Sequence, residues 1–293
     1  MTYFIFKTLF RLIALLPLRA VHILGALVGH AAFALSRGYA ERTEESLRQA
    51  HLATDEKHFA ALLGQAISEA GKGIVELPWV WGRPLEQVFA TVKSFDGWEH
   101  IDAARARGKG IIFLTQHWGC FEVIALYIGQ RMPLTNLYSP PKQGWLEKIM
   151  RSGRERGQAQ LATADVSGVR SLYKALKRGE AIGLLPDQVP SRGEGEWADF
   201  FSRPAYTMTL SGRLAQASGA PVLLAFAERL PHSAGYALRV EPLPPLDFSK
   251  PVPSQINAAL ERVIAISPAQ YLWSYNRYKI PRGVMPPDVG KER

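Results

Sequence analysis

The residues best suited to chemistry lie in the segment from Thr115 to Glu122, which reads Thr-Gln-His-Trp-Gly-Cys-Phe-Glu. His117 follows a short apolar run typical of a buried strand, and Glu122 lies on the helix that is expected to begin after it. A helical turn can bring the Glu122 carboxylate back to one imidazole nitrogen, where it would fix the tautomer and support the cation that forms. The other nitrogen could then take a proton from a substrate hydroxyl that attacks an acyl donor, with no covalent enzyme intermediate. The alternative is a histidine that caps a helix beside a surface glutamate.

Cys120 lies inside the same segment and is a candidate nucleophile. A buried helical cysteine that acts as a small apolar residue is the favoured interpretation. It is the only cysteine of the 293 residues, so the chain has no intrachain disulfide and no cysteine-based zinc site. The seven histidines include no pair spaced three or four residues apart. We therefore expect neither a metal nor a cofactor. The backbone N–H groups of Gly119 and Cys120 are expected to be free at the start of the helix.

Two further groups could bind a substrate. Arg151 and Arg154 share one face of a predicted helix with Lys148, and such a face can hold phosphates or an acidic carrier protein. Asp187 and Gln188 follow another short apolar run, where a buried strand should end. A solvated helix face and a turn aspartate are the alternative interpretations.

These residues need a scaffold, and apolar strands that alternate with helices from residue 86 onward predict one. The pattern indicates a layered α/β fold with a mixed, mainly parallel sheet flanked by helices. Strands are expected at 87–93, 110–115, 134–138, 160–162, 181–185, 221–227 and 236–241. Helices are expected at 40–50, 55–72, 99–107, 121–128, 144–156, 166–178, 207–217 and 254–266. Ligands bind beyond the carboxyl ends of such strands, which points to the loops 116–120, 139–143 and 186–205.

Residues 3–36 are mostly apolar, but charged residues and Pro17 interrupt them. The cleanest run, residues 20–36, is marginal for a spanning helix, which needs about 20 apolar residues. The segment could span the membrane once, lie in the interface, be a cleaved signal peptide, or form a buried hairpin in a soluble core. Membrane association by one of the first two routes is favoured. The signal peptide ranks last, because the charges are scattered through the stretch.

The chain carries a net charge of +9 at pH 7. A basic surface attracts phosphates, anionic lipids, acidic proteins or nucleic acid. No recognisable nucleic-acid-binding module accompanies the charge, so we expect no nucleic-acid partner.

Three ordered blocks resemble those of the late acyltransferases of lipid A biosynthesis, the lauroyl and myristoyl transferase group. The resemblance covers roughly residues 5–280, an estimate by eye. The blocks comprise Gly108-Lys109-Gly110 followed by Thr115 to Glu122, then Arg151-x-x-Arg154, then Gly179 to Gln188 followed by Phe200-Phe201 and Pro204-Ala205. The N-terminal Leu16-Pro17-Leu18-Arg19 and the ending Trp273 to Lys279 are also similar.

The resemblance implies a fold like that of glycerolipid acyltransferases with an N-terminal apolar membrane-associated helix. It implies an enzyme on the cytoplasmic side of the bacterial inner membrane that moves an acyl chain from acyl-acyl carrier protein to a hydroxyl of a lipid A precursor. By residue match His117 would be the base, Glu122 its partner, and Arg154 and Asp187 functional residues of the other blocks. The expected divisions are a membrane anchor at 1–36, a helical region at 37–85, an acyltransferase domain at 86–285 and a tail at 286–293.

Two departures from the family pattern put the exact acceptor in doubt. Ser202 stands where a glycine often follows the paired phenylalanines, and Tyr275-Asn276 replaces more basic residues. These departures leave the chemistry intact, and one alternative is an acyltransferase that acts on another lipid. A separate alternative is a membrane scaffold that binds phospholipid without turnover, in which the His117–Glu122 pair is structural.

Overall fold

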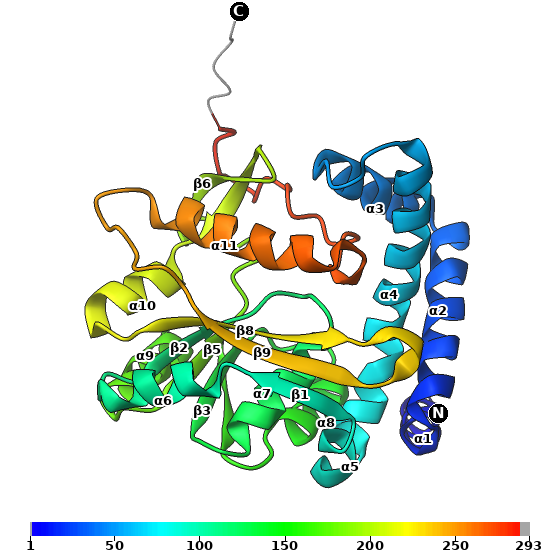
Figure 1. Ribbon diagram of the computed structural model, residues 1–293, viewed down its shortest axis with the longest axis horizontal. Helices are drawn as coiled ribbons and strands as arrows, with labels where there is room; N and C mark the ends of the chain where they lie inside the picture. Colours follow the sequence, from blue (N-terminus) through cyan, green and yellow to red (C-terminus); the bar gives the residue numbers. More distant parts are fainter. Residues whose placement is uncertain (1, 288–293) are drawn as a thin grey trace, which may run out of the picture.

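A seven-stranded sheet lies at the centre of the structure, a computed structural model that describes residues 2–287 (Figure 1). Its strand order is β1-β9-β8-β2-β5-β3-β4. The strands β4, β3, β5, β2 and β8 run parallel, whereas β9 is antiparallel to β8 and β1 is parallel to β9. The predicted α/β fold with a mixed, mainly parallel sheet is confirmed. The bounds are β1 Val92–Asp96, β2 Ile111–Leu114, β3 Leu134–Tyr138, β4 Ala159–Thr163, β5 Ala181–Leu184, β8 Val222–Arg229 and β9 Tyr236–Pro242.

Helices cover both faces of this sheet, so all residues of β2 and β5 are buried. Ile112 and Leu114 pack on the side of α9, α10 and α11, whereas Ile111 and Phe113 pack on the side of α5, α6 and α7. This alternation follows from the two-residue period of a strand. The helix bounds are α5 Leu85–Phe89, α6 Trp98–Ala106, α7 Phe121–Gly129, α8 Gly144–Arg154, α9 Val166–Lys177, α10 Leu210–Ser218 and α11 Val252–Ile266.

The parallel strands bring the loops after β2, β3 and β5 to one edge of the sheet, because their carboxyl ends point the same way. These are the loops that the sequence indicated as ligand-binding. Part of the third is not a loop: β6 (Gly195–Phe200) and β7 (Arg203–Met208) form an antiparallel hairpin. The sequence analysis missed this hairpin, because its polar and glycine residues obscure the strand pattern.

Two other elements of the structure differ from the sequence prediction. The strand expected at 87–93 is instead the helix α5 followed by β1. Leu85, Val88 and Phe89 also have helical spacing, and Val88 is fully buried in the core cluster that includes α7. The second predicted helix is longer than expected: α4 runs from Glu56 to Gly82, through Pro78.

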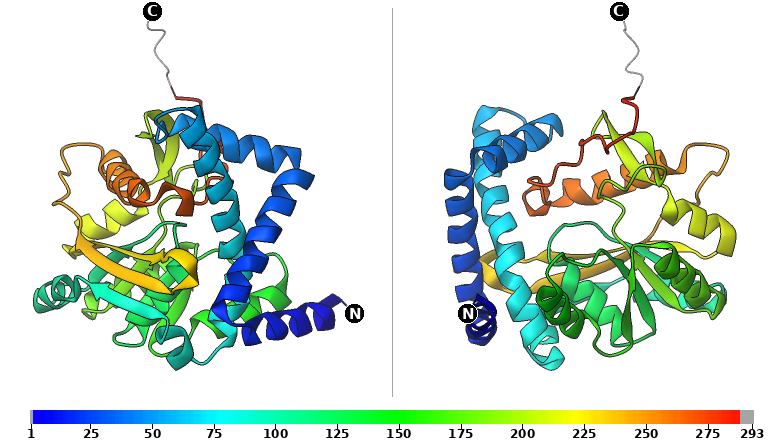
Figure 2. Two further views of the ribbon diagram at one scale, coloured as in Figure 1. Left: turned by 45° about the vertical axis from the view of Figure 1, so that its right-hand side comes forward. Right: turned by 180° about the vertical axis from the view of Figure 1, so that it is seen from behind.

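The N-terminal region consists of α1 (Thr2–Leu15), α2 (Leu18–Leu35), α3 (Arg37–Gln49) and the long α4. Figure 2 shows α2 along one flank of the molecule, with α4 between it and the sheet. Gly25 and Gly29 of α2 face Gly71 of α4 so closely that a Cβ on Gly29 would lie 2.2 Å from the Ile67 carbonyl oxygen. Glycine therefore permits the two helices to touch along their backbones.

Candidate active site

His117 lies on a loop that leaves β2 and crosses the carboxyl end of the neighbouring β8. Gly119 makes this crossing with φ of +55°, and a Cβ there would lie 1.9 Å from the carbonyl oxygen of Ala227. Only glycine fits such a position without a shift of the backbone. The Cys120 amide donates to the same Ala227 oxygen at 2.9 Å, and the Gly119 amide donates to Gln270 at 3.0 Å. The two N–H groups expected to be free are therefore occupied, which corrects that prediction.

The C-terminal segment holds the loop from its other side. Trp118 is fully buried, and its indole N–H donates to the carbonyl oxygen of Ser267 at 3.0 Å. The Leu272 amide donates to the carbonyl oxygen of His117 at 3.0 Å. The position of the imidazole thus depends on residues that lie about half the chain away in sequence.

The carboxylate that orients His117 is Asp187, at the end of β5. The imidazole Nδ1 lies 3.0 and 3.1 Å from the two Asp187 oxygens, and the His117 amide donates to Oδ2 at 2.9 Å. Asp187 is 2% exposed. Burial acts to raise the pKa of its carboxyl, but the His117 charge and hydrogen bonds outweigh burial and hold the pKa below its ordinary value. Asp187 is therefore an ionised partner that fixes the proton on Nδ1.

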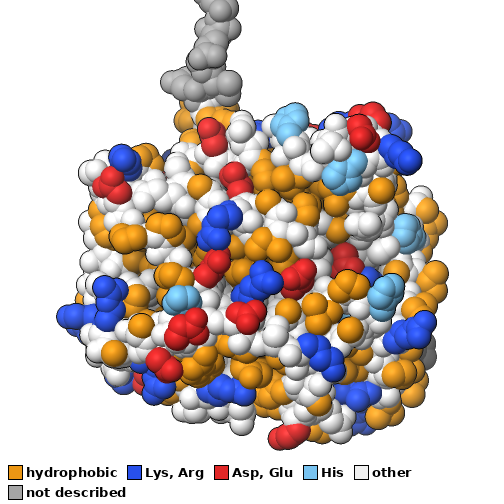
Figure 3. Space-filling model, in the orientation of Figure 1, with side chains coloured by type: hydrophobic (Ala, Val, Ile, Leu, Met, Phe, Trp, Pro, Cys, Tyr) orange, Lys and Arg blue, Asp and Glu red, His pale blue; other side chains and the backbone are white. Residues whose placement is uncertain are grey.

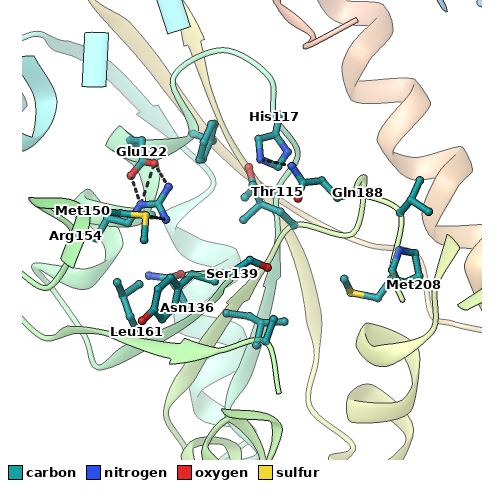
Figure 4. A pocket seen from close by; sticks show the side chains of 18 of the residues that line it. Thr115, His117, Glu122, Asn136, Ser139, Met150, Arg154, Leu161, Gln188 and Met208 are labelled. Atoms are coloured by element: carbon teal, nitrogen blue, oxygen red, sulfur yellow. Dashed lines mark hydrogen bonds and ion pairs between the residues drawn. The ribbon is translucent and has the colours of Figure 1, made fainter. Parts of the chain in front are cut away.

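The second imidazole nitrogen faces a cavity. Because Nδ1 donates its proton to Asp187, Nε2 carries a lone pair, which accepts a hydrogen bond from the Gln188 side-chain amide at 3.3 Å. This geometry leaves Nε2 able to take a proton from a group that displaces Gln188. Figure 4 shows Gln188 and Thr115 beside His117 at one end of the cavity.

Glu122 does not make the contact that its spacing predicted. Within the described residues its carboxylate is bound by the Arg154 guanidinium, whose Nε donates to both oxygens at 3.0 Å, and by the Trp81 indole N–H at 3.1 Å. Glu122 is buried on the first turn of α7, and the turn directs its side chain toward α8 and α4. The expected Glu122–His117 pair is therefore replaced by a His117–Asp187 pair and by a separate Glu122–Arg154 pair, the second of which is drawn in Figure 4.

His117 and the Glu122–Arg154 pair line one cavity of about 410 Å³ at the carboxyl edge of the sheet, and Asp187 lies buried behind His117. Its walls combine the polar groups with apolar side chains from α7, β3, α8, β4 and the segment before β6. The apolar lining residues are Phe121, Ala125, Leu126, Leu137, Met150, Leu161, Ala164, Leu185, Val189, Pro190 and Met208. The cavity suits a ligand with one reactive polar end and a hydrocarbon chain.

Arg151, on the last turn of α8, lies at the margin of this cavity. It donates to the hydroxyl of the lining residue Tyr138 at 2.8 Å and pairs with Glu155. The Tyr138 hydroxyl in turn donates to Glu147 at 2.9 Å. Arg151 thus contributes positive charge beside the cavity without contacting His117 or Glu122.

Cys120 is buried beneath the loop and belongs to the core cluster on the α7 side. Burial, with further contributions from Glu76 and Glu122, raises the pKa of its thiol well above the usual range. A neutral buried thiol is a poor nucleophile. Across residues 2–287, no cluster of three or more histidine, cysteine or acidic side chains is arranged to hold a metal ion.

The structure contains a second histidine–carboxylate pair, which the sequence analysis missed. Glu76 of α4 accepts from His22 at 2.9 Å, from Arg229 at the end of β8 at 2.9 Å and from the Tyr236 hydroxyl at 2.6 Å. Burial acts to raise the pKa of the Glu76 carboxyl, but Arg229 and His22 hold it well below its ordinary range. The only sequence signal was an acidic residue on the apolar stretch of a helix. This network joins α2 and α4 to the sheet.

The whole chain matches a known family. The sequence model of the bacterial lipid A biosynthesis acyltransferases covers residues 1–280. The chain belongs to that family. It is therefore an O-acyltransferase, and the resemblance noted in the three sequence blocks is confirmed.

Individual relatives are similar to this chain, two of them over nearly the full length. The lipid A biosynthesis lauroyltransferase of Escherichia coli K12 is 26% identical over 278 residues, which are 93% of this chain and 90% of that protein. The palmitoleoyltransferase of the same organism is 27% identical over 275 residues, 90% of this chain and 86% of that protein. An acyltransferase of lipid A biosynthesis from Haemophilus influenzae is 27% identical over 184 residues, 61% of this chain and 57% of that protein.

Proposed function

We propose that this acyltransferase moves a fatty acyl chain from acyl-acyl carrier protein to a hydroxyl of a lipid A precursor at the cytoplasmic face of the bacterial inner membrane. Family membership supports acyl transfer in lipid A biosynthesis. The observation that carries the proposal further is the imidazole of His117, which Asp187 orients and whose Nε2 faces a cavity with apolar walls.

In the proposed reaction the acceptor hydroxyl takes the place of the Gln188 amide at Nε2 of His117. Nε2 removes the hydroxyl proton while the oxygen attacks the thioester carbonyl carbon and forms the new ester bond. Collapse of the tetrahedral intermediate breaks the carbon–sulfur bond, and the imidazolium returns the proton to the departing thiolate. Asp187 remains ionised and stabilises the imidazolium, in agreement with the lowered pKa of its carboxyl.

Glu122 takes a different part in this proposal from the one predicted. Its carboxylate holds the Arg154 guanidinium at the wall of the same cavity, on the other side of His117 from Gln188 (Figure 4). A guanidinium fixed in this way can bind a phosphate group or polarise the donor. Glu122 thus acts by positioning Arg154, while Arg151 and Arg154 remain predicted substrate-binding residues.

The experiment is an assay of the purified protein with radiolabelled acyl-acyl carrier protein and a lipid A precursor. We expect label in the lipid with the natural chain and with His100→Ala, a control that replaces a partly exposed histidine on α6. We expect a loss of about 10²- to 10⁴-fold in kcat with His117→Ala, the range for a general base. Retained activity of His117→Ala would exclude His117 as the base.

Two substrate comparisons test the rest of the proposal. Acyl-coenzyme A in place of the carrier protein should be a poorer donor, and a glycerophospholipid in place of the precursor should be a poorer acceptor. Faster transfer to the glycerophospholipid would indicate another lipid acceptor. Binding of the precursor without any turnover would indicate the scaffold alternative.

A further inference from the structure

The helix α2 is the one described helix that is long and apolar enough to cross a membrane. Its 18 residues span about 27 Å, close to the hydrocarbon thickness of about 30 Å. Length and composition alone therefore allow a transmembrane segment. The contacts of α2 with the rest of the folded protein, however, argue against a crossing of the membrane.

The amino-terminal end of α2 is attached to the body of the enzyme. The Trp79 indole and the Arg83 guanidinium donate to the carbonyl oxygen of Leu16 at 3.0 and 2.8 Å. On the first turns of α2, His22 contacts Ser233, in the connection between β8 and β9, at 3.0 Å. The same imidazole contacts the buried Glu76.

The carboxyl-terminal end of α2 is attached to the same body. The helix passes directly into α3, whose Leu47 is 1% exposed and belongs to the core cluster of α9, α10 and α11. Glu45 of α3 also pairs with Arg203 of the β6–β7 hairpin at 3.0 Å. Between the two ends, the glycine contact with α4 continues along the helix, and His30 contacts Ser68 of α4 at 3.1 Å. Figure 2 shows α2 beside α4 over its amino-terminal part, whereas its carboxyl end leans away from α4 and is joined back to the body by α3.

A helix that crossed the bilayer would place these two ends on opposite sides of it. Here the amino-terminal end contacts the folded body directly and the carboxyl end is joined to the same body through α3. A crossing would therefore place β8, β9 and the Glu76–Arg229 ion pair at the depth of the hydrocarbon. Ionised groups at that depth are costly. The geometry therefore points to a helix that does not cross.

The outward side of α1 and α2 has the composition of a surface that lies on lipid. Its large exposed side chains are Leu9, Leu12, Leu15, Ile23, Leu24, Leu27, Val28 and Leu35. Lys7, Arg11 and Arg19 lie along the same segment, and residues 1–36 contain no acidic residue. Apolar residues interspersed with bases suit the interface of an anionic membrane. In Figure 3 hydrophobic, basic and histidine side chains mix along the edge where α2 lies.

We infer that α1 and α2 dock the enzyme onto one leaflet as two interfacial helices, with both ends of α2 on the side of the active site. The inference deepens the proposed function and rests on its membrane attachment. It excludes a single crossing by α2. It also places the outward face of α2, rather than its ends, in the headgroup region.

The first test asks on which side of the membrane each end of α2 lies. Background labelling should be low, because Cys120 is the only native cysteine and is buried. Thr8→Cys and Arg37→Cys replace exposed residues before and after α2. A membrane-impermeant maleimide is added to right-side-out and to inverted inner-membrane vesicles, with the native chain as background. We expect both variants to react in inverted vesicles alone. Reaction of the two variants in vesicles of opposite orientation would overturn the inference.

Depth is the second test. A spin label at Leu27→Cys, near the middle of α2, is measured in vesicles of phosphatidylethanolamine and phosphatidylglycerol. We expect a depth of about 5–10 Å, whereas a crossing helix would place the label about 15 Å deep at the bilayer centre. Val166→Cys is the matched control, since Val166 is 69% exposed on α9 and Leu27 63% exposed. A Leu27 label at the bilayer centre overturns the inference, and one fully in water overturns membrane docking altogether.

The labelling and depth results can be distinguished from a failure of the proposed acyl transfer. Opposite-side labelling would leave acyl transfer in the assay unaffected. Loss of transfer by the natural chain, with both labels on one side, would leave the docking mode intact.

Discussion

Two hydrogen-bonded histidine–carboxylate pairs lie in the described part of this enzyme, and they differ in what surrounds them. His117 and Asp187 are 3.0 Å apart, and His22 and Glu76 are 2.9 Å apart. Nε2 of His117 faces a cavity and is bound only weakly by Gln188, at 3.3 Å. Both nitrogens of His22 have partners, the partly buried Ser233 and the buried Glu76, and Glu76 also binds Arg229 and Tyr236. Distance alone thus does not make a catalytic pair. Reactivity needs an accessible nitrogen and a carboxylate that has no stronger partner.

The largest expected effect comes from removing the charge of the accessible pair. Asp187→Asn should lower kcat by about 10²- to 10⁴-fold, because the imidazole loses the carboxylate that fixes its tautomer and stabilises its cation. The measurement is initial-rate transfer of labelled acyl chain at saturating substrate. An Asp187→Asn enzyme with the natural kcat would show that the two pairs do not differ in function.

The isosteric change in the enclosed pair should affect stability instead. Glu76→Gln leaves the buried Arg229 with only the partly exposed Glu69 as ionic partner. We expect the free energy of unfolding to fall by about 3–5 kcal/mol, the range for breaking a buried ion pair. Denaturant unfolding measures this change. The kcat of the folded fraction should stay close to that of the natural enzyme, and a large loss of kcat would assign the enclosed pair a catalytic part.

A third pair, Glu122 and Arg154, sharpens the comparison because it lines the same cavity as His117 without touching it. A double-mutant cycle of Glu122→Gln and Arg154→Gln should give a coupling energy of about 0.5–3 kcal/mol in stability. A cycle of Glu122→Gln with Asp187→Asn should be additive. Strong coupling in the second cycle would indicate that Glu122 interacts with the His117–Asp187 pair, as the sequence spacing predicted.

Acidification should weaken both histidine–carboxylate pairs. The pKa values of Asp187 and Glu76 are lowered in the folded enzyme, that of Glu76 further. Their contribution to stability is therefore complete above the ordinary carboxyl pKa of about 4 and is lost as the pH falls through the lowered values. Urea unfolding at a series of pH values should show the deficit of Glu76→Gln shrinking below about pH 4. A deficit that is constant with pH would mean that the Glu76 charge contributes nothing.

The smallest effect is expected at Cys120. This residue lies three positions after His117 in the sequence and close to Glu76 in space. Its raised thiol pKa excludes a thiolate nucleophile near neutral pH. Cys120→Ala should keep kcat within about twofold, because the side chain acts as a small apolar residue. The stability loss should be about 1 kcal/mol. Rates and unfolding curves of the variant check both values, and inactivation would make Cys120 the nucleophile.

Much of the sheet was predictable because its central strands are continuous apolar runs. The expected strands at 110–115, 134–138 and 181–185 correspond to β2, β3 and β5. Burial on both faces makes such runs unambiguous. The β6–β7 hairpin was not predictable, since it packs on α11 beside the C-terminal segment rather than in the main sheet. Its structure depends on contacts such as that of Arg277 with the Tyr206 carbonyl oxygen.

The sequence by itself determined the family, the mainly parallel sheet and the placement of His117, Asp187 and Gln188 at strand ends. Only the tertiary structure decided which of these residues meet. Local spacing favoured Glu122 as the partner of His117, but the adjacency of β2 and β5 brings Asp187 to the imidazole across 70 residues. The direction of the first turn of α7 sends Glu122 to Arg154. The partner of a side chain is fixed by the order of strands in space, and that order is a property of the whole packed sheet.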